Sequence, residues 1–297
     1  MKIAILGNCQ IESIEASLRV LVPDAHIQLF HVWNVTTQFS RNQSLIEHLR
    51  NFDLVLSHRF YDLVGFDFDE LKQELDVLEF PALNFAAFHP DCVYLVDDKT
   101  HKIVRSCLGD YNSALIAFCF ANGLTKEQCL SAFRESVFSH VGYFSMWDNS
   151  VMALDAELQR CGLKVGNYIP KWMAVKPFMN SINHPKIFAI NDILIDMLAT
   201  RHIATRQISG IDDYSADPLI NYAKWPIYPE LASYFGVQGG YTFKSETKMD
   251  GQKYIFGLSE FIEDSYTRYA ALEVEKFRND MLAIWGGMNL ADLIRSQ

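Results

Sequence analysis

Short apolar runs alternate with helical patterns over the first third of the chain, and this alternation limits the fold more than any other feature. The apolar runs cover residues 3–6, 25–30, 53–57 and 82–88. The helical patterns cover residues 11–21, 44–50 and 68–78. Helices between short apolar runs are typical of parallel strands joined by crossover helices. The sequence therefore predicts an α/β fold in which a parallel sheet is flanked by helices.

The remaining chain has mostly helical periodicity. Helical patterns cover residues 112–122, 126–138, 150–161, 186–201 and 258–293. Short strand patterns interrupt them at 93–96, 103–106, 237–244 and 251–256. We therefore expect a parallel sheet core over residues 1–110 and a largely helical elaboration over residues 111–297, packed together as one unit.

The composition argues against several classes of protein. The formal net charge is -10 at pH 7, whereas a general nucleic-acid-binding protein carries a basic field. No apolar run approaches the roughly 20 residues that span a bilayer, and the first residues resemble a strand rather than a signal peptide. Neither the six cysteines nor the nine histidines show a metal-binding spacing. We expect a cytoplasmic protein with free thiols and no metal, nucleic-acid partner or membrane span. Its oligomeric state is open, and a homo-oligomer is compatible with the sequence.

Three polar motifs stand at the ends of apolar runs. They are Gly7-Asn8-Cys9-Gln10, Phe88-His89-Pro90-Asp91 and Ile182-Asn183-His184-Pro185. Ligands of open α/β sheets gather at the carboxyl ends of the strands, next to such motifs. The proline after each histidine restricts that residue to an extended backbone, which suits a site that holds an imidazole still. We expect Cys9, His89 and His184 to line one pocket.

Each of these residues has two interpretations. Cys9 is placed near a helix N-terminus, where the macrodipole favours a thiolate and lowers the pKa of the thiol. A free cysteine in a βα turn is also a common small core residue. His89 can equally be a turn residue packed against Phe85 and Phe88, and His184 a residue that caps the following helix.

A cysteine with a histidine in reach is the general form of an activated nucleophile, and a third polar group can orient the base. Cys9 supplies the thiol, His89 or His184 the base, and Asp91 a carboxylate to orient it. Neutral side chains suited to stabilise an oxyanion or bind a substrate accompany the motifs: Asn8, Gln10, Asn84 and Asn183.

The ordered set of motifs resembles the WcbI family of polysaccharide biosynthesis proteins. GNCQ follows the first strand, HPD follows a later apolar run, and NHP opens a late helix. The segments WPIYPEL at 225–231, SEFI at 259–262 and SY at 265–266 also resemble that family's C-terminal part. The family is similar to SGNH hydrolases in its sheet, and it is associated with coenzyme A binding and with acetyl transfer to a capsule sugar. The resemblance implies that Cys9 takes the place of the nucleophilic serine and His184 that of the late catalytic histidine.

The chain departs from the SGNH pattern at two points. Ser181, rather than Asp, stands three residues before His184. Ser57-His58-Arg59 stands where the pattern has Gly-x-Asn-Asp. Asp91 is then the carboxylate left to complete a triad.

Coenzyme A needs cations for its phosphates and a slot for its adenine. Arg59 follows the third apolar run, and a small basic cluster follows the HPD motif. Trp172, beside Lys171, is a candidate to cover the adenine ring. The alternative for the charged residues is a solvated surface position. The full set of candidate coenzyme A contacts is Arg59, Lys99, Lys102, Arg105, Lys171 and Trp172.

The function expected from the motifs and the resemblance is an acyltransferase that moves an acetyl group from acetyl-coenzyme A to a sugar hydroxyl in surface or capsular polysaccharide biosynthesis. Two mechanisms are open: Cys9 forms an acyl-enzyme, or a histidine acts as general base for direct attack by the sugar. An SGNH-like esterase or deacetylase that uses the same site is one alternative. A non-catalytic coenzyme A or glycan binding module is the other.

Overall fold

The computed structural model describes residues 1–61, 63–246, 254–272 and 276–296. These residues form two compact units, and both units are discontinuous in sequence. Unit 1 contains residues 1–84, 153–178 and 183–219, and unit 2 contains residues 85–152, 179–182 and 220–297. The sequence predicted a single division of the chain, after residue 110.

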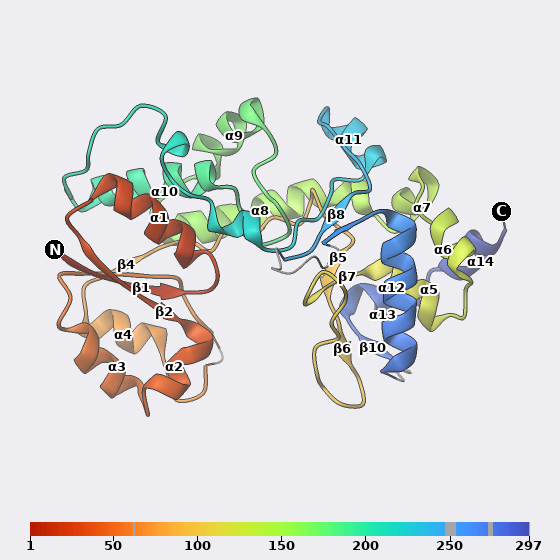
Figure 1. Cartoon of the computed structure of the whole chain (residues 1–297), viewed down its shortest axis with the longest axis horizontal. Helices are drawn as coiled ribbons and strands as arrows, with labels where there is room; N and C mark the ends of the chain where they lie inside the picture. Colours follow the sequence, from red (N-terminus) through yellow and green to blue (C-terminus); the bar gives the residue numbers. More distant parts are fainter. Residues whose placement is uncertain (62, 247–253, 273–275, 297) are drawn as a thin grey trace. The chain divides into compact units, whose positions relative to one another are not determined.

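Unit 1 contains a parallel four-stranded sheet, which confirms the expected α/β fold (Figure 1). The strand order is β2-β1-β3-β4, and all three strand pairs are parallel. In β1, every residue after Lys2 is buried, as expected for a central strand. The strands are β1 (Lys2–Gly7), β2 (His26–His31), β3 (Leu54–Ser57) and β4 (Val77–Glu79).

Helices cover both faces of this sheet (Figure 1). One face packs against α2 (Val32–Gln38), α3 (Asn42–Leu49) and α4 (Phe68–Glu74), whose apolar side chains share a core with Leu6 and Val55. The other face carries α1 (Ile11–Leu21), which packs on α10 (Ile187–Thr200). Unit 1 also contains α9 (Ile169–Val175) and most of α8 (Met146–Arg160).

The fourth strand of the sheet differs from the expected one. β4 covers Val77–Glu79, at the end of the segment expected to be helical, and α4 ends at Glu74. The apolar run at 82–88 is irregular. Its buried members, such as Leu83 and Phe85, contribute to the core without forming a strand. A short apolar run can form either a strand or a buried irregular segment. Periodicity does not distinguish these two structures, because the run has the same composition in both.

Unit 2 combines seven helices with three two-stranded antiparallel pairs in its described part. The pairs are β5 (Cys92–Tyr94) with β7 (Tyr111–Ser113), β6 (Val96–Asp97) with β10 (Phe277–Arg278), and β8 (Phe243–Lys244) with β9 (Ile255–Phe256). The helices are α5 (Ala114–Ala121), α6 (Lys126–Ser131), α7 (Glu135–His140), α11 (Pro229–Phe235), α12 (Leu258–Ala271), α13 (Asp280–Trp285) and α14 (Leu290–Arg295).

Three expected boundaries in unit 2 are corrected by the structure. The helix expected from residue 112 begins at Ala114, because Ser113 ends β7 and caps the helix through its hydroxyl. The helix expected over 126–138 is two helices, separated by the extended backbone of Arg134. The strand expected over 237–244 is only Phe243–Lys244, and residues 251–253 of the last expected strand lie outside the described residues.

The described residues contain neither a membrane-spanning helix nor a cluster of metal-binding side chains. No helix in these segments is long and apolar enough to cross a membrane. The same segments hold no group of three or more His, Cys, Asp and Glu side chains placed to bind a metal ion.

Candidate functional site

The GNCQ motif forms the turn between β1 and α1. β1 ends at Gly7, and the side-chain oxygen of Asn8 accepts a hydrogen bond from the main-chain N–H of Gln10 at 3.0 Å. Gly7 lies against the ring of His58, which follows β3. A Cβ atom on residue 7 would stand 2.3 Å from Nδ1 of His58, so the close approach requires glycine. The turn places Cys9 just beyond the carboxyl end of β1, as the sequence predicted.

Gln10 ties this turn to two distant segments of unit 1. Its side-chain amide donates to the main-chain oxygens of Leu83 and Asn183, each at 3.0 Å. Its side-chain oxygen accepts from the N–H of Leu83, also at 3.0 Å. Gln10 is fully buried, and both of its amide hydrogens are used. The expected role of Gln10 as an oxyanion donor is therefore corrected: it joins the turn to the NHP segment.

The Cys9 thiol does not have the lowered pKa that its position suggested. Burial raises the pKa of this half-buried thiol to about 11, and the carboxylate of Glu12 adds to the rise. The main-chain N–H groups of Cys9 and Gln10 oppose it, but they are outweighed. Cys9 is therefore a protonated thiol at neutral pH, and it needs a base before it can act as a nucleophile.

His184 lies in the same unit as Cys9 and directly follows the residue that Gln10 holds. It is 4% exposed, and α10 begins three residues later, at Ile187. The N-cap of that helix is Lys186, so the capping role considered for His184 is excluded. Cys9 directly precedes Gln10, and His184 directly follows Asn183. The hydrogen bond from Gln10 to Asn183 therefore links the segments that carry Cys9 and His184.

His89 and Asp91 belong to unit 2. His89 is 2% exposed, and its Nδ1 lies 3.3 Å from the main-chain oxygen of Pro226. Its ring also packs edge-on against Phe88, in line with the structural interpretation of this residue. The convergence of His89 with Cys9 stays a prediction.

Asp91 is a buried structural centre rather than a partner for a histidine. Its carboxylate accepts hydrogen bonds from Ser113 at 2.5 Å, Tyr143 at 2.7 Å and Tyr228 at 2.6 Å. The N–H of Leu115, in the first turn of α5, donates at 2.8 Å. Burial raises the pKa of Asp91, although these hydrogen bonds oppose the rise. The expectation that Asp91 orients a catalytic base is wrong, because its oxygens are used by this network.

The other expected neutral donors have different surroundings. Asn8 and Asn183 are half-buried. Asn84 is exposed, and its amide makes a long contact of 3.4 Å with the main-chain oxygen of Ala82. Their roles toward a substrate stay predictions.

Arg59 is engaged in a network of charged side chains. Its guanidinium makes two hydrogen bonds to Asp69, at 2.9 and 3.1 Å, and one to Glu79 at 3.3 Å. Glu79 also accepts from Lys72 and Arg160. Burial disfavours the charged form of Glu79, but Lys72 and Arg59 together hold its pKa below the usual value. These contacts use three of the five guanidinium N–H donors and place two carboxylates beside the positive charge of Arg59, which weakens its attraction for a phosphate.

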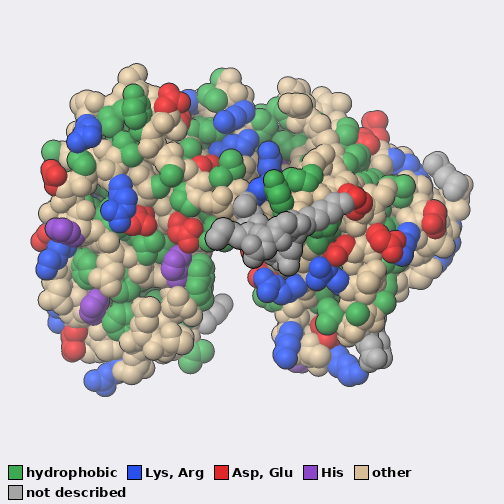
Figure 2. All heavy atoms as spheres, viewed as in Figure 1, with side chains coloured by type: hydrophobic (Ala, Val, Ile, Leu, Met, Phe, Trp, Pro, Cys, Tyr) green, Lys and Arg blue, Asp and Glu red, His purple; other side chains and the backbone are tan. Residues whose placement is uncertain are grey.

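The remaining expected contacts of coenzyme A divide into paired and unpaired cations. Arg105 is paired with Asp110 at 2.9 Å, and Lys171 with Asp192 at 2.5 Å. Within the part of the chain that the structure describes, the exposed ammonium groups of Lys99 and Lys102 form no ion pair. Acidic and basic side chains are interspersed on the face drawn in Figure 2.

Trp172 is wrongly assigned as an adenine platform. It is fully buried, with its ring 5.3 Å from that of Tyr168 and 4.9 Å from that of Phe178. Its ring N–H donates to Asp192 at 2.9 Å. Trp172 therefore belongs to the core of unit 1, and no ring face is open to a ligand.

His58 is a further candidate residue that the sequence did not predict. It is 3% exposed, and neither ring nitrogen has a hydrogen-bond partner among the described residues. Burial lowers the pKa of His58 to about 4, so the ring is neutral. Leaving a buried polar group without a partner costs about 1–3 kcal/mol, so such a group requires a structural or functional reason. The available signal was its place directly after a buried strand.

Comparisons with known proteins identify the family and the fold of this chain. A family model described as the polysaccharide biosynthesis enzyme WcbI matches residues 2–205. A solved structure of WcbI has a TM-score of 0.62 and 15% sequence identity, and the match covers 99% of this chain and 97% of that one. It is described as a novel polysaccharide biosynthesis enzyme, in a native form without a disulfide bond between coenzyme A and one of its cysteines. No curated protein matches the chain at a significant level.

The family match includes the whole sheet, the GNCQ turn and the NHP segment, and the similarity of fold extends over both units. The chain belongs to the WcbI family of polysaccharide biosynthesis enzymes.

Proposed function

We propose that this protein transfers an acyl group, most simply acetyl, from coenzyme A to a sugar hydroxyl during surface polysaccharide biosynthesis. The family description supports the pathway, and the coenzyme A named for the solved WcbI structure supports the donor. The observation that carries the proposal is the bond from Gln10 to Asn183, which holds the Cys9 turn and the His184 segment together at the end of β1.

The protonation of Cys9 favours direct transfer over an acyl-enzyme. A thiol with a pKa of about 11 is a poor nucleophile at neutral pH. In direct transfer, His184 accepts the proton of the sugar hydroxyl while that oxygen attacks the thioester carbonyl. The carbon–sulfur bond then breaks, and coenzyme A leaves as a thiol after taking up a proton. Cys9 would border the thioester and help to position it.

The experiment measures coenzyme A binding and acyl transfer separately. Coenzyme A should raise the melting temperature by mass action, and salt should weaken the effect because the phosphates are held by exposed cations such as Lys99 and Lys102. His184→Gln should abolish release of free coenzyme A from acetyl-coenzyme A in the presence of a sugar acceptor, while the melting shift remains. Cys107→Ser, which changes a half-buried thiol in unit 2, is the control.

Each outcome decides between the candidate functions. If coenzyme A gives no melting shift while a simple ester is hydrolysed, the protein is an esterase and the proposal is wrong. If coenzyme A binds but no acceptor supports transfer in a broad sugar panel, the protein is a binding module. A Cys9→Ala variant that retains transfer would establish the direct mechanism, because alanine has no nucleophilic atom to carry an acyl group.

A further inference from the structure

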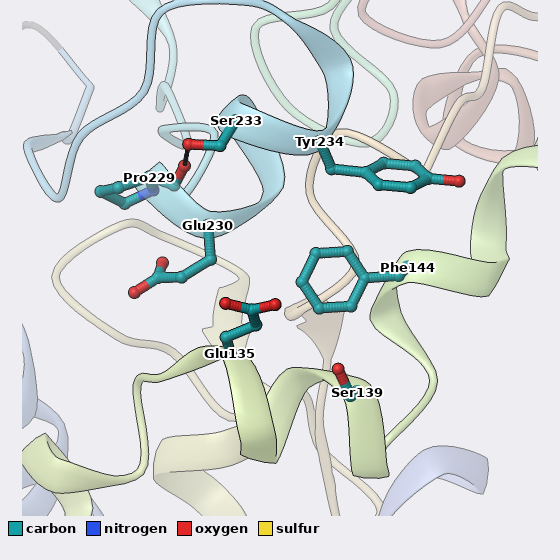
Figure 3. A pocket seen from close by; sticks show the side chains of 7 residues that line it. All are labelled: Glu135, Ser139, Phe144, Pro229, Glu230, Ser233 and Tyr234. Carbon is teal, nitrogen blue, oxygen red and sulfur yellow. Dashed lines mark hydrogen bonds between the residues drawn. The ribbon is translucent and has the colours of Figure 1, made fainter.

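Unit 2 contains a pocket that is separate from the residues discussed so far (Figure 3). Its volume is about 540 Å³, within the range of small-molecule sites. It lies between α7 and α11, and Figure 3 shows side chains of both helices around one hollow. The residues that characterise it are Glu135, Ser139, Phe144, Glu230 and Tyr234.

The polar groups of this pocket can accept hydrogen bonds but cannot bind an anion. Glu135 and Glu230 contribute carboxylates, and no Lys or Arg is among the lining residues. The hydroxyl of Tyr241 donates to Glu230 at 2.8 Å and leaves its other oxygen available. Neither carboxylate is part of an ion pair within the described residues. The two carboxylates favour a ligand that offers hydrogen-bond donors, and they disfavour the phosphates of coenzyme A.

The apolar part of the pocket is an aromatic pair. The rings of Phe144 and Tyr234 meet at 66°, with their centroids 5.6 Å apart. Tyr234 is 61% exposed, although an aromatic ring is usually covered in a folded protein. The exposed Tyr234 ring and the partly buried Phe144 ring give the pocket an apolar surface. The ligand that combines several hydroxyl donors with an apolar C–H face is a sugar ring.

We propose that this pocket binds an uncharged sugar residue of the glycan acceptor. The aromatic pair supports the C–H face of the sugar, and Glu135 and Glu230 accept hydrogen bonds from its hydroxyls. The assignment to an acceptor rests on the proposed function, whereas the binding of a sugar stands on the pocket alone. A carboxylate-bearing sugar is rejected, because it would meet two like charges without a cation.

The test is a set of binding titrations followed by ligand-observed NMR, without coenzyme A. The probes are the methyl glycosides of glucose, galactose, mannose and N-acetylglucosamine, with methyl glucuronide as the anionic sugar and tetramethylammonium as a cation. At least one uncharged glycoside should bind saturably, and methyl glucuronide should not. Tyr234→Ala should weaken binding by about tenfold or more, and Tyr234→Phe should retain it because the ring remains. Glu230→Gln should weaken binding without unfolding the protein.

The controls separate this inference from the proposed function. Tyr214→Ala, which removes a 65% exposed tyrosine of unit 1, should leave sugar binding unchanged. Absence of saturable binding for every uncharged glycoside overturns the inference, as does tight binding of tetramethylammonium alone. If sugars bind but coenzyme A gives no melting shift, the pocket assignment stands and the acyltransferase proposal falls. If coenzyme A binds and sugars do not, the pocket assignment falls and the acyltransferase proposal stands.

Discussion

The side-chain amide of Gln10 donates a hydrogen bond to the main-chain oxygen of Asn183, 173 residues away in the sequence. This bond, together with two to Leu83, positions the turn that carries Cys9 relative to the segment that carries His184. The geometry of the candidate site therefore depends on a residue that has no direct chemical role in the proposed reaction.

Gln10→Leu should destabilise the protein strongly. The substitution leaves the N–H of Leu83 and two carbonyl oxygens without their partner in a buried position, at a cost of about 2–5 kcal/mol in the free energy of unfolding. Urea denaturation measures this cost. Gln38→Leu, at an exposed position in α2, is the control and should change stability little. A loss below about 1 kcal/mol for Gln10→Leu would show that the three bonds are not needed.

Alkylation of Cys9 should have the pH dependence of an unactivated thiol. With a pKa of about 11, the rate with iodoacetamide should rise about tenfold per pH unit between pH 7 and 9, without a plateau. Glu12→Gln should increase the rate about threefold at fixed pH, because it removes the carboxylate that disfavours the thiolate. Glu15→Gln, which changes the carboxylate three residues after Glu12 in α1, is the matched control. A plateau below pH 8 would contradict the raised pKa.

Gly7→Ala should be destabilising because the added methyl group meets the His58 ring. The new Cβ would stand 2.3 Å from His58 Nδ1 and 2.7 Å from Cγ2 of Ile11, and the strain should cost about 1–3 kcal/mol. In a His58→Ala background the same substitution should cost less, which a double-mutant cycle measures. Gly166→Ala adds its methyl group in open space and should be nearly neutral. Equal costs in both backgrounds would exclude the contact with His58.

His58 should make the protein less stable as the pH falls from 6.5 toward 4. Its pKa of about 4 in the folded protein lies below the ordinary value of 6.5, so the unfolded chain takes up a proton that the native state does not. The stability that neutral His58 contributes is fully present above pH 6.5. Roughly 2 kcal/mol of it should be lost by pH 5. His58→Phe should flatten the dependence of unfolding free energy on pH in this range, and an unchanged slope would assign the effect to other titrating groups.

The local sequence was enough to predict part of the fold. The order from β1 to β3 and the helices α1 and α10 were predicted because periodicity and flanking residues report local conformation. The fourth strand was predicted in the wrong place, because strand pairing of Val77–Glu79 with β3 outweighed the local helical pattern. The place of Cys9 after β1 was predicted, since strand, turn and helix follow one another directly.

The sequence by itself determined an α/β protein with GNCQ at the end of its first strand, and the ordered motifs placed it near the WcbI family. Only the tertiary structure decided what surrounds each side chain. Trp172 became a core residue, Asp91 a buried hydrogen-bond centre and Arg59 a member of an ion network. The Cys9 thiol gained a raised rather than a lowered pKa. The physical reason is that burial and pairing depend on residues brought together from distant parts of the chain, whereas propensity and periodicity depend on neighbours in sequence.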